Sequence, residues 1–332
     1  MDTLRKLSSS NMEGKQVCVT GANGFIGRHL VDALLQQGCL VRVLTRQPDF
    51  CPPAYVQVII GDLTSPNCQF DQFLEGCEVL YHCAGEVLNP LRMEALHVEG
   101  TRRLTVAASG VINHWVQLSS VGVYGPVSHG LIDEHSTLNP IGTYEVTKEK
   151  SDQIIIDAAM KGGFSYSILR PSNVYGRSMT NQSLFNMIAM IDKGLFFYIG
   201  KSGASVNYIH VDNVVEGLLL CGKLNSAKGK VYNLSDYCSL EFFVNVICTE
   251  LGRVPPKLRM PRAVSYFLAN TLGKFLKFPL TQSRINALVN CSIYPISAIQ
   301  HETGYIHVKS MEEGLRELVA EYKKRLRRCE LK

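Results

Sequence analysis

Tyr144 and Lys148 are four residues apart in a segment that predicts a helix, so both side chains should lie on one helix face. A neighbouring ammonium lowers the pKa of a phenol from about 10 towards neutrality, which would let Tyr144 protonate a carbonyl or accept a proton from an alcohol. Ser120 follows a predicted strand at 114–119, and its hydroxyl could bind the same carbonyl oxygen, with Ser119 as the rival. Because Tyr-x-x-x-Lys is common on exposed helices, the catalytic interpretation needs a second motif.

A glycine-rich turn near the N-terminus supplies that second motif. Gly21, Gly24 and Gly27 lie between a predicted strand at 16–20 and a predicted helix at 25–37. A turn without Cβ atoms lets a pyrophosphate approach the backbone, and the N-terminus of the helix offers it unpaired N–H groups. This setting between strand and helix predicts a site for a nicotinamide dinucleotide. The same turn contains Asn23, Phe25 and Ile26.

Three residues bear on which dinucleotide binds. A carboxylate at the end of the second strand would hold the ribose 2′-hydroxyl of NAD, but this position is Thr45 and Arg46 follows it. An arginine can pair with the 2′-phosphate of NADP, so NADP is favoured over NAD, unless Arg46 is simply a surface residue. Asp62, after the third strand, could accept a hydrogen bond from the adenine amine or could form a turn or helix cap.

The predicted elements alternate between strand and helix from residue 16 to residue 169. This alternation is typical of an α/β fold, the Rossmann doubly wound parallel sheet with helices on both faces. Strands are expected at 16–20, 40–45, 56–61, 79–83, 114–119 and 166–169, and helices at 25–37, 93–109 and 144–160. Strands at 206–210 and 230–234 are expected to return to this sheet, with a helix at 212–221 between them.

The chain is expected to divide into two parts. Residues 14–175, joined by 205–235, would form the dinucleotide-binding domain. Residues 176–204 and 236–330 would form a smaller, mostly helical C-terminal lobe for the substrate, with one helix at 183–193. Ser310 and Glu313 have the spacing of a capping box, so the last helix should begin there.

The composition argues against several classes of protein. With 332 residues, 46% of them hydrophobic, the chain can bury a core without disulfides or metal. Its 11 cysteines include no Cys-x-x-Cys pair, which indicates free thiols and a cytoplasmic location. Its 9 histidines include no His-x-x-x-His pair, so no metal site is expected. The net charge of +5 is mild and the basic run at 323–328 stands alone, so no nucleic acid partner is expected.

Two segments of the sequence bear on membrane association and export. Residues 1–13 lack the apolar stretch of a signal peptide. The apolar segment 263–280 is interrupted by Lys274 and Lys277 and is too short to span a membrane. A buried amphipathic helix is the preferred interpretation of this segment, and a helix lying on a membrane surface is the alternative.

Taken together, the motifs resemble those of the extended short-chain dehydrogenase/reductase family, and they occur in the family's order between residue 15 and about residue 215. The resemblance implies a Rossmann fold, hydride transfer with a nicotinamide cofactor, a small-molecule substrate and a homodimer. The segments that carry it are 20–27 (TGANGFIG), 61–63 (GDL), 82–85 (HCAG), 118–125 (LSSVGVYG), 144–148 (YEVTK), 169–176 (LRPSNVYG) and 208–212 (YIHVD).

The matching motifs also imply roles for individual residues. Ser120, Tyr144 and Lys148 take the catalytic positions, and Ser120 rather than Ser119 matches because it lies four residues before Tyr124. The expected substrate contacts are Glu86, Ser120 and Asn173. The expected cofactor contacts are Gly21, Asn23, Gly24, Phe25, Ile26, Gly27, Arg46, Asp62, Leu63, Cys83, Ala84, Gly85, Tyr144, Lys148 and Pro171.

The chain departs from the family's pattern at two places. The usual Asn-Val-x-Gly-Thr is His97-Val-Glu-Gly-Thr here, and His97 is interpreted as structural rather than catalytic. Members that act on nucleotide sugars usually carry Arg-Asp before Tyr-Ile-His-Val, but this pair is Val206-Asn207. One arginine expected to bind phosphate is therefore missing, and Arg284 is only a candidate for another.

Three enzymatic functions fit these residues. The first is an NADPH-dependent reductase of a 4-keto nucleotide sugar, favoured by Arg46 and Asn173. The second is a nucleotide-sugar 4-epimerase, against which Thr45 and the missing Arg-Asp pair count. The third is a dehydrogenase of a hydrophobic alcohol or ketone, similar to 3β-hydroxysteroid dehydrogenases or dihydroflavonol reductases, which the apolar C-terminal lobe would suit. A dinucleotide sensor without activity is disfavoured because both Tyr144 and Lys148 are present.

Overall fold

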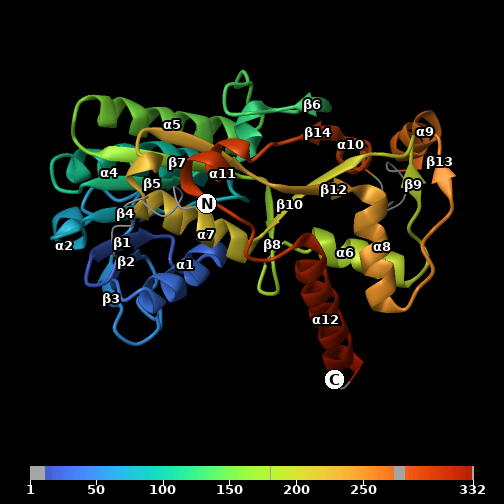
Figure 1. Ribbon diagram of the computed structural model, residues 1–332, viewed down its shortest axis with the longest axis horizontal. Helices are drawn as coiled ribbons and strands as arrows, with labels where there is room; N and C mark the ends of the chain where they lie inside the picture. The colour runs from blue at the N-terminus through green and yellow to red at the C-terminus, as the bar shows by residue number, and fades with distance from the viewer. Residues whose placement is uncertain (1–11, 180, 273–280, 331–332) are drawn as a thin grey trace, which may run out of the picture.

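The structure, a computed structural model, describes residues 12–179, 181–272 and 281–330 (Figure 1). Its main sheet has seven parallel strands in the order β11-β7-β5-β4-β1-β2-β3. These are β1 (Gln16–Thr20), β2 (Leu40–Thr45), β3 (Gln57–Ile60), β4 (Val79–His82), β5 (His114–Leu118), β7 (Ser165–Pro171) and β11 (Lys230–Leu234). The predicted α/β fold is confirmed, and the strand order reverses between β1 and β4, where such sheets bind ligands.

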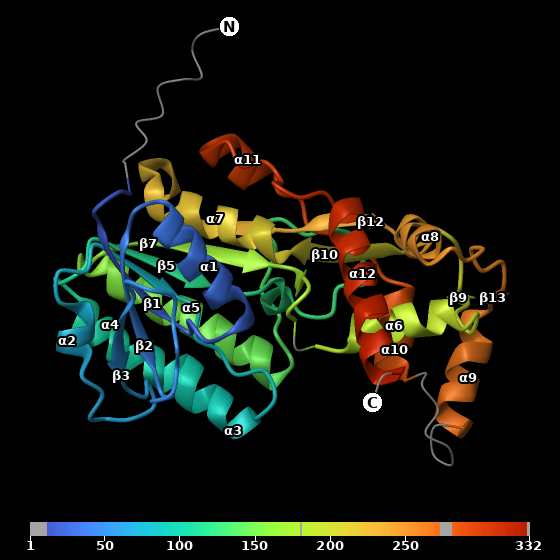
Figure 2. The same cartoon turned by 90° about the horizontal axis from the view of Figure 1, so that it is seen from below.

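Helices cover both faces of the main sheet, and Figure 2 shows the sheet between two helical layers. Val19, Leu30 and Leu218 belong to the buried core under one layer, and Trp115 and Ile155 to the core under the other. The first layer contains α1 (Phe25–Gln36) and α7 (Val211–Lys223); the second contains α2 (Phe70–Leu74), α4 (Thr101–Ala108) and α5 (Thr143–Met160).

The helix expected at 93–109 is not a uniform α-helix. It consists of α3 (Pro90–Met93), a π-helical segment at Glu94–Gly100 and α4. A π-helical turn accommodates an extra residue and often occurs at functional sites. The segment contains His97, which is 2% exposed. A hydrophobic pattern alone does not distinguish this turn from an α-helix, so the sequence missed it.

The C-terminal half contributes most of a second cluster of elements, centred on the buried side chains of Leu184, Phe243 and Leu315. Its helices are α6 (Ser183–Asp192), α8 (Leu240–Leu251), α9 (Arg262–Leu272), α10 (Gln282–Leu288) and α12 (Met311–Glu330), whereas α11 (Ser297–Thr303) packs against β11 and α7 of the main sheet. The small strands are β6 (His129–Leu131), β8 (Asn173–Tyr175), β9 (Tyr198–Ile199), β10 (Ser205–His210), β12 (Asp236–Ser239), β13 (Arg259–Met260) and β14 (Cys291–Ile293).

One strand expected in the main sheet lies elsewhere. Residues 230–234 do return to it as β11, but β10 pairs with β8 and β12 in a separate sheet of three strands. The expectation that 206–210 joins the main sheet was therefore wrong, because an apolar strand pattern does not specify its partner. The capping box is confirmed: Glu313 N donates to Ser310 Oγ, and Ser310 N donates to Glu313 Oε2.

The structure also bears on the membrane and metal expectations. Val264 and Phe267 of α9 are 45% and 66% exposed, so the part of 263–280 that is described is not a fully buried helix; residues 273–280 lie outside the described residues. Among the described helices, none is both long and apolar enough to cross a membrane. The ten cysteines whose side chains the structure describes are free, and among the described residues no cluster of His, Cys, Asp and Glu could hold a metal ion.

Candidate active site

The glycine turn has the close backbone contacts that its sequence predicts. Gly21 has a φ of +74°, and a Cβ there would lie 2.6 Å from the backbone nitrogen of Ala84. A Cβ on Gly27 would overlap the carbonyl oxygen of Gly21, so the first turn of α1 packs directly against the end of β1. Gly24 is the N-cap of α1 and supplies no side-chain cap. The first N–H groups of the helix can therefore donate to an anionic ligand.

Two adjoining cavities lie along this turn. One of about 1100 Å³ opens at the carboxyl ends of β1, β4, β5 and β7, and one of about 190 Å³ lies beside the ends of β2 and β3. The cavities share part of their walls, namely Asn23, Gly24, Cys83, Ala84 and Gly85. Every predicted site residue except Glu86 lines one or both of them. The sequence motifs, which are spread over 150 residues (Gly21 to Pro171), thus meet at one edge of the sheet.

The two serines after β5 have different surroundings. Ser119 is buried, and its Oγ donates to Asp152 Oδ2 at 2.7 Å. Ser120 lines the larger cavity together with Tyr144, and its Oγ accepts from Gly122 N at 3.1 Å. The geometry therefore favours Ser120 over Ser119 as the serine that faces a substrate.

Lys148 is held beneath the cavity rather than against the Tyr144 phenol. Its Nζ donates to the carbonyl oxygen of Leu118 at 2.5 Å, and its side chain is buried. Burial lowers the pKa of Lys148, while the negative charge of Asp152 works in the opposite direction. The ammonium still lines the cavity wall, so it lies within reach of a bound ligand.

The phenol of Tyr144 is less acidic than the sequence argument implied. Burial, followed by the charges of Glu145 and Asp152, raises the pKa of Tyr144 to about 12, while the Ser120 hydroxyl acts in the opposite direction. The expected lowering of this pKa by Lys148 is not seen, because the ammonium is directed at the Leu118 carbonyl. Without a ligand, Tyr144 is therefore a neutral phenol that can donate a proton.

The smaller cavity brings together the residues expected to hold adenosine. Arg46 is exposed and lines it with Thr45, Asp62 and Leu63. Asp62 Oδ1 accepts from the N–H and the hydroxyl of Thr64, at 2.9 and 2.8 Å, so the carboxylate forms the turn that was its alternative interpretation. It lines the cavity as well, so the turn and a ligand contact are compatible.

Glu86 has a different position from the one expected. Its Oε1 accepts from the backbone N–H groups of Val87 and Leu88 at 3.0 and 2.9 Å, and these bonds lower its pKa, with a contribution from the charge of Arg46. The carboxylate thus shapes the loop before α3, and Glu86 does not line either cavity. The sequence reasoning also missed Tyr294 in the cavity wall, because no motif surrounds it.

The part of the larger cavity beyond the glycine turn has few charges. Its apolar wall includes Val87, Val121, Val174 and Tyr294. Among the described residues, the basic side chains of the whole wall are Arg28 and His29 of α1 and Lys148, and the acidic ones are Asp32 and Glu145. At the position where nucleotide-sugar enzymes carry arginine, Val206 is buried in the second core, and the neighbouring Asn207 donates to the carbonyl of Ser292 at 2.9 Å.

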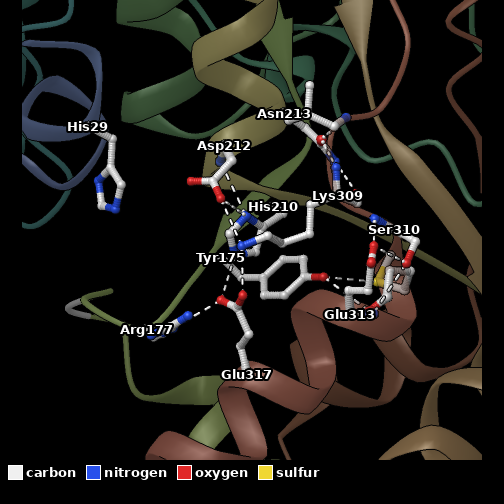
Figure 3. A network of polar contacts seen from close by, with 12 residues as sticks. His29, Tyr175, Arg177, His210, Asp212, Asn213, Lys309, Ser310, Glu313 and Glu317 are labelled. Carbon is white, nitrogen blue, oxygen red and sulfur yellow. Dashed lines mark hydrogen bonds and ion pairs between the residues drawn. The ribbon is translucent and has the colours of Figure 1, made fainter. Parts of the chain in front are cut away.

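The motif at 208–212 has a structural role in this fold. His210 Nδ1 accepts from Asp212 N at 3.2 Å and so caps α7, while Lys309 Nζ bridges Asp212 and Glu317 at 2.8 and 2.7 Å (Figure 3). Arg177 adds a third ion pair with Glu317, at 3.0 Å. This network ties α12 to the ends of β10 and β8, so the C-terminal helix stabilises the strand that carries Asn173.

Comparison with known proteins agrees with this geometry. A model of the NAD dependent epimerase/dehydratase family matches residues 17–235. The sterol-4-alpha-carboxylate 3-dehydrogenase (decarboxylating) of Mus musculus is 28% identical over 80% of this chain and 77% of its own. A 4-hydroxy-2-methyl-3-oxo-4-farnesyl-3,4-dihydroquinoline-1-oxide ketoreductase of Stigmatella aurantiaca is 28% identical over 71% and 75%. The solved structure of MoeE5 with UDP-glucose and NAD superposes with a TM-score of 0.73 at 23% identity, covering 94% of this chain and 99% of that one.

Proposed function

We propose, from its membership of the NAD dependent epimerase/dehydratase family, that the chain interconverts a ketone and an alcohol on an apolar substrate. Members of this family of the extended short-chain type are NAD(P)-dependent oxidoreductases and epimerases. The observation that carries the proposal is the cavity wall beyond the glycine turn, where valines and Tyr294 replace the cations that a diphosphate needs. The sterol dehydrogenase and the farnesyl-quinoline ketoreductase, both relatives, point to the same substrate class.

The proposed chemistry divides between the cofactor and three side chains. The bound dinucleotide supplies or receives the hydride. Tyr144 donates its phenolic proton to the carbonyl oxygen during reduction and accepts it back during oxidation. Ser120, which lines the cavity with Tyr144, donates to the same carbonyl oxygen and stabilises its developing charge. Lys148, whose ammonium is held by the Leu118 carbonyl, would supply a positive charge on the cofactor side of the site, and the charge of Asp152 favours its charged form.

The same proposal assigns the parts of the chain to the two ligands. Residues 14–175 with 205–235 hold the dinucleotide, and 176–204 with 236–330 complete the substrate end. The adenosine half would lie in the smaller cavity against Asp62 and Leu63, and the nicotinamide half would lie beside Cys83 and Pro171. The N–H groups of Phe25, Ile26 and Gly27, in the first turn of α1, would hold the pyrophosphate.

A nucleotide sugar remains the second candidate, with a 4-keto reductase ahead of a 4-epimerase. Asn173 favours it, because this exposed amide lines the cavity and is fixed by a hydrogen bond to the carbonyl of Asn207 at 3.3 Å. The sequence alone placed the 4-keto reductase first. The small number of charged side chains beyond the glycine turn and the buried Val206 are our reasons for placing the apolar substrate ahead of it.

Thermal-shift screening in the presence of NADP⁺ separates the two substrate classes. We expect a 3β-hydroxysteroid or a 3-ketosteroid to raise the melting temperature, and UDP and dTDP at the same concentration to leave it unchanged, because binding to the native state alone stabilises it. Stabilisation by UDP or dTDP and not by the steroids would overturn the apolar proposal in favour of the second candidate.

We predict that NADPH binds more tightly than NADH, because the guanidinium of Arg46 can pair with the 2′-phosphate. Energy transfer from the only tryptophan, Trp115, to the bound nicotinamide gives both dissociation constants. Arg46→Gln should weaken NADPH about tenfold, which corresponds to roughly 1.4 kcal/mol, and leave NADH within about twofold. A tenfold preference of the unaltered protein for NADH would contradict this assignment.

The two directions of reaction should differ in their pH dependence. Reduction needs the neutral phenol of Tyr144 and oxidation needs the phenolate, and the pKa of this phenol is raised to about 12. We therefore expect kcat/KM for reduction to be level between about pH 6 and 9 and that for oxidation to rise throughout this range. Initial rates in both directions measure this. A reduction rate that falls through a pKa near 7 would show that the phenol titrates far lower than its surroundings imply.

A further inference from the structure

His97 occupies a position between the cofactor loop and the residue proposed as acid and base. It lies in the π-helical segment, with both ring nitrogens bonded inside the protein. Glu86 N donates to Nε2 at 2.8 Å, and Nδ1 lies 2.8 Å from the hydroxyl oxygen of Thr147. Thr147 in turn donates to the carbonyl oxygen of Tyr144 at 3.0 Å. Three consecutive hydrogen bonds therefore connect the loop after β4 to the first turn of α5.

The directions of these hydrogen bonds determine the tautomer of the His97 imidazole. A backbone N–H can only donate, so Nε2 must carry a lone pair and the ring proton lies on Nδ1. This proton goes to the Thr147 oxygen, whose own single proton goes to the Tyr144 carbonyl, and every donor has an acceptor. Burial, followed by the charge of Lys148, lowers the pKa of His97 to about 3. The ring is consequently neutral over the whole range in which the protein would be assayed.

The imidazole ring of His97 also contacts Tyr144 and Gly85 directly. Its plane meets the Tyr144 ring edge to face, with centroids 5.7 Å apart. On the other side, a Cβ on Gly85 would lie 3.6 Å from Nε2, so Gly85 packs against the ring. Gly85 lines both cavities, and Tyr144 lines the larger one. A displacement of His97 would therefore move the cofactor loop and the phenol relative to each other.

We propose that His97 is a positioning residue. As a neutral imidazole, it holds the Tyr144 phenol and the loop at 85–87 in the relative position that hydride transfer requires. The proposal rests on the role proposed for Tyr144. It assigns a function to a residue that stands where the related motif carries asparagine. The imidazole reaches further from the backbone than an asparagine amide does, and it adds an aromatic face against Tyr144, which an amide lacks.

The test compares His97→Leu, His97→Asn and Thr147→Val with His114→Leu. His114 is a suitable control because it is also buried and hydrogen-bonded, to Ser165 and Ser167, but lies at the start of β5 away from the cavities. With NADPH and 5α-androstane-3,17-dione as the probe ketone, we expect both His97 variants to lower kcat at least tenfold. Thr147→Val removes two of the three hydrogen bonds but keeps the imidazole, its bond from Glu86 N and its contact with the Tyr144 ring, so it should lower kcat by a smaller factor. His114→Leu should lower the melting temperature and leave kcat within about twofold.

Two further readouts distinguish positioning from general destabilisation. The double variant His97→Leu/Thr147→Val should be no slower than His97→Leu, because both changes break one chain of bonds. The ratio of variant to unaltered kcat should be constant from about pH 6 to 9, because the ring stays neutral. Losses that multiply, a ratio that changes with pH, or kcat retained by folded His97→Leu would each overturn the proposal. If Tyr144→Phe were active in the same assay, the proposed function would fail instead.

Discussion

Tyr144→Phe should abolish turnover, with kcat reduced at least about a thousandfold, while the dissociation constant of NADPH changes less than about twofold. The variant removes one hydroxyl from a partly buried ring whose remaining contact, the edge-to-face packing on His97, is preserved. The carbonyl oxygen then loses its proton donor, while Ser120 keeps its hydrogen bond from Gly122 N. Steady-state kinetics and energy transfer from Trp115 measure the two quantities separately.

A control variant shows whether loss of a tyrosine hydroxyl elsewhere in the protein also lowers kcat. Tyr237 lies on β12, is 52% exposed and lines neither cavity. Tyr237→Phe should therefore keep kcat within about twofold. Activity retained by Tyr144→Phe would move the proton-transfer role to another side chain and would remove the basis of the proposed chemistry.

The second large effect concerns the glycine turn. Gly21→Ala should weaken NADPH at least about a hundredfold, because its Cβ would lie 2.6 Å from backbone atoms of Cys83 and Ala84. Relief of that clash has to move either the turn or the loop after β4, and both line the cavities. The φ of +74° adds strain of its own, which needs a separate control.

Gly14→Ala provides this control. Gly14 has nearly the same φ, +75°, but a Cβ there would meet nothing within 4 Å. Both variants should lose a similar amount of stability from strain, on the order of 1 kcal/mol, in chemical denaturation. Only Gly21→Ala should lose the cofactor. Equal NADPH affinities of the two variants would mean that the close approach at Gly21 does not shape the site.

Much of the site could be predicted because its chemistry depends on short local motifs. The glycine turn, Ser120, Tyr144 and Lys148 each sit at the end of a strand or on one helix face, and the parallel sheet necessarily brings these ends to one edge. The capping box of α12 was predictable for the same reason, since Ser310 and Glu313 interact within one helical turn.

The features that the sequence missed depend on contacts between distant segments. The pKa of Tyr144 follows from burial and from where the Lys148 ammonium is directed, which their spacing of four residues does not determine. The pairing of β10 with β8 and β12, rather than with the main sheet, is likewise a matter of tertiary packing. Tyr294 reaches the cavity wall from a segment 150 residues beyond Tyr144 in the chain (294 against 144).

Transfer of a hydride to an apolar ketone is the central claim, and isotope labelling measures it most directly. The protein would be incubated with NADPH carrying deuterium at both C4 positions of the nicotinamide and with 5α-androstane-3,17-dione, and the product analysed by mass spectrometry. We predict an alcohol with one deuterium on the carbinol carbon, formed by the unaltered protein and not by Tyr144→Phe. Absence of this product, together with deuterium incorporation into a 4-keto nucleotide sugar under the same conditions, would contradict the account.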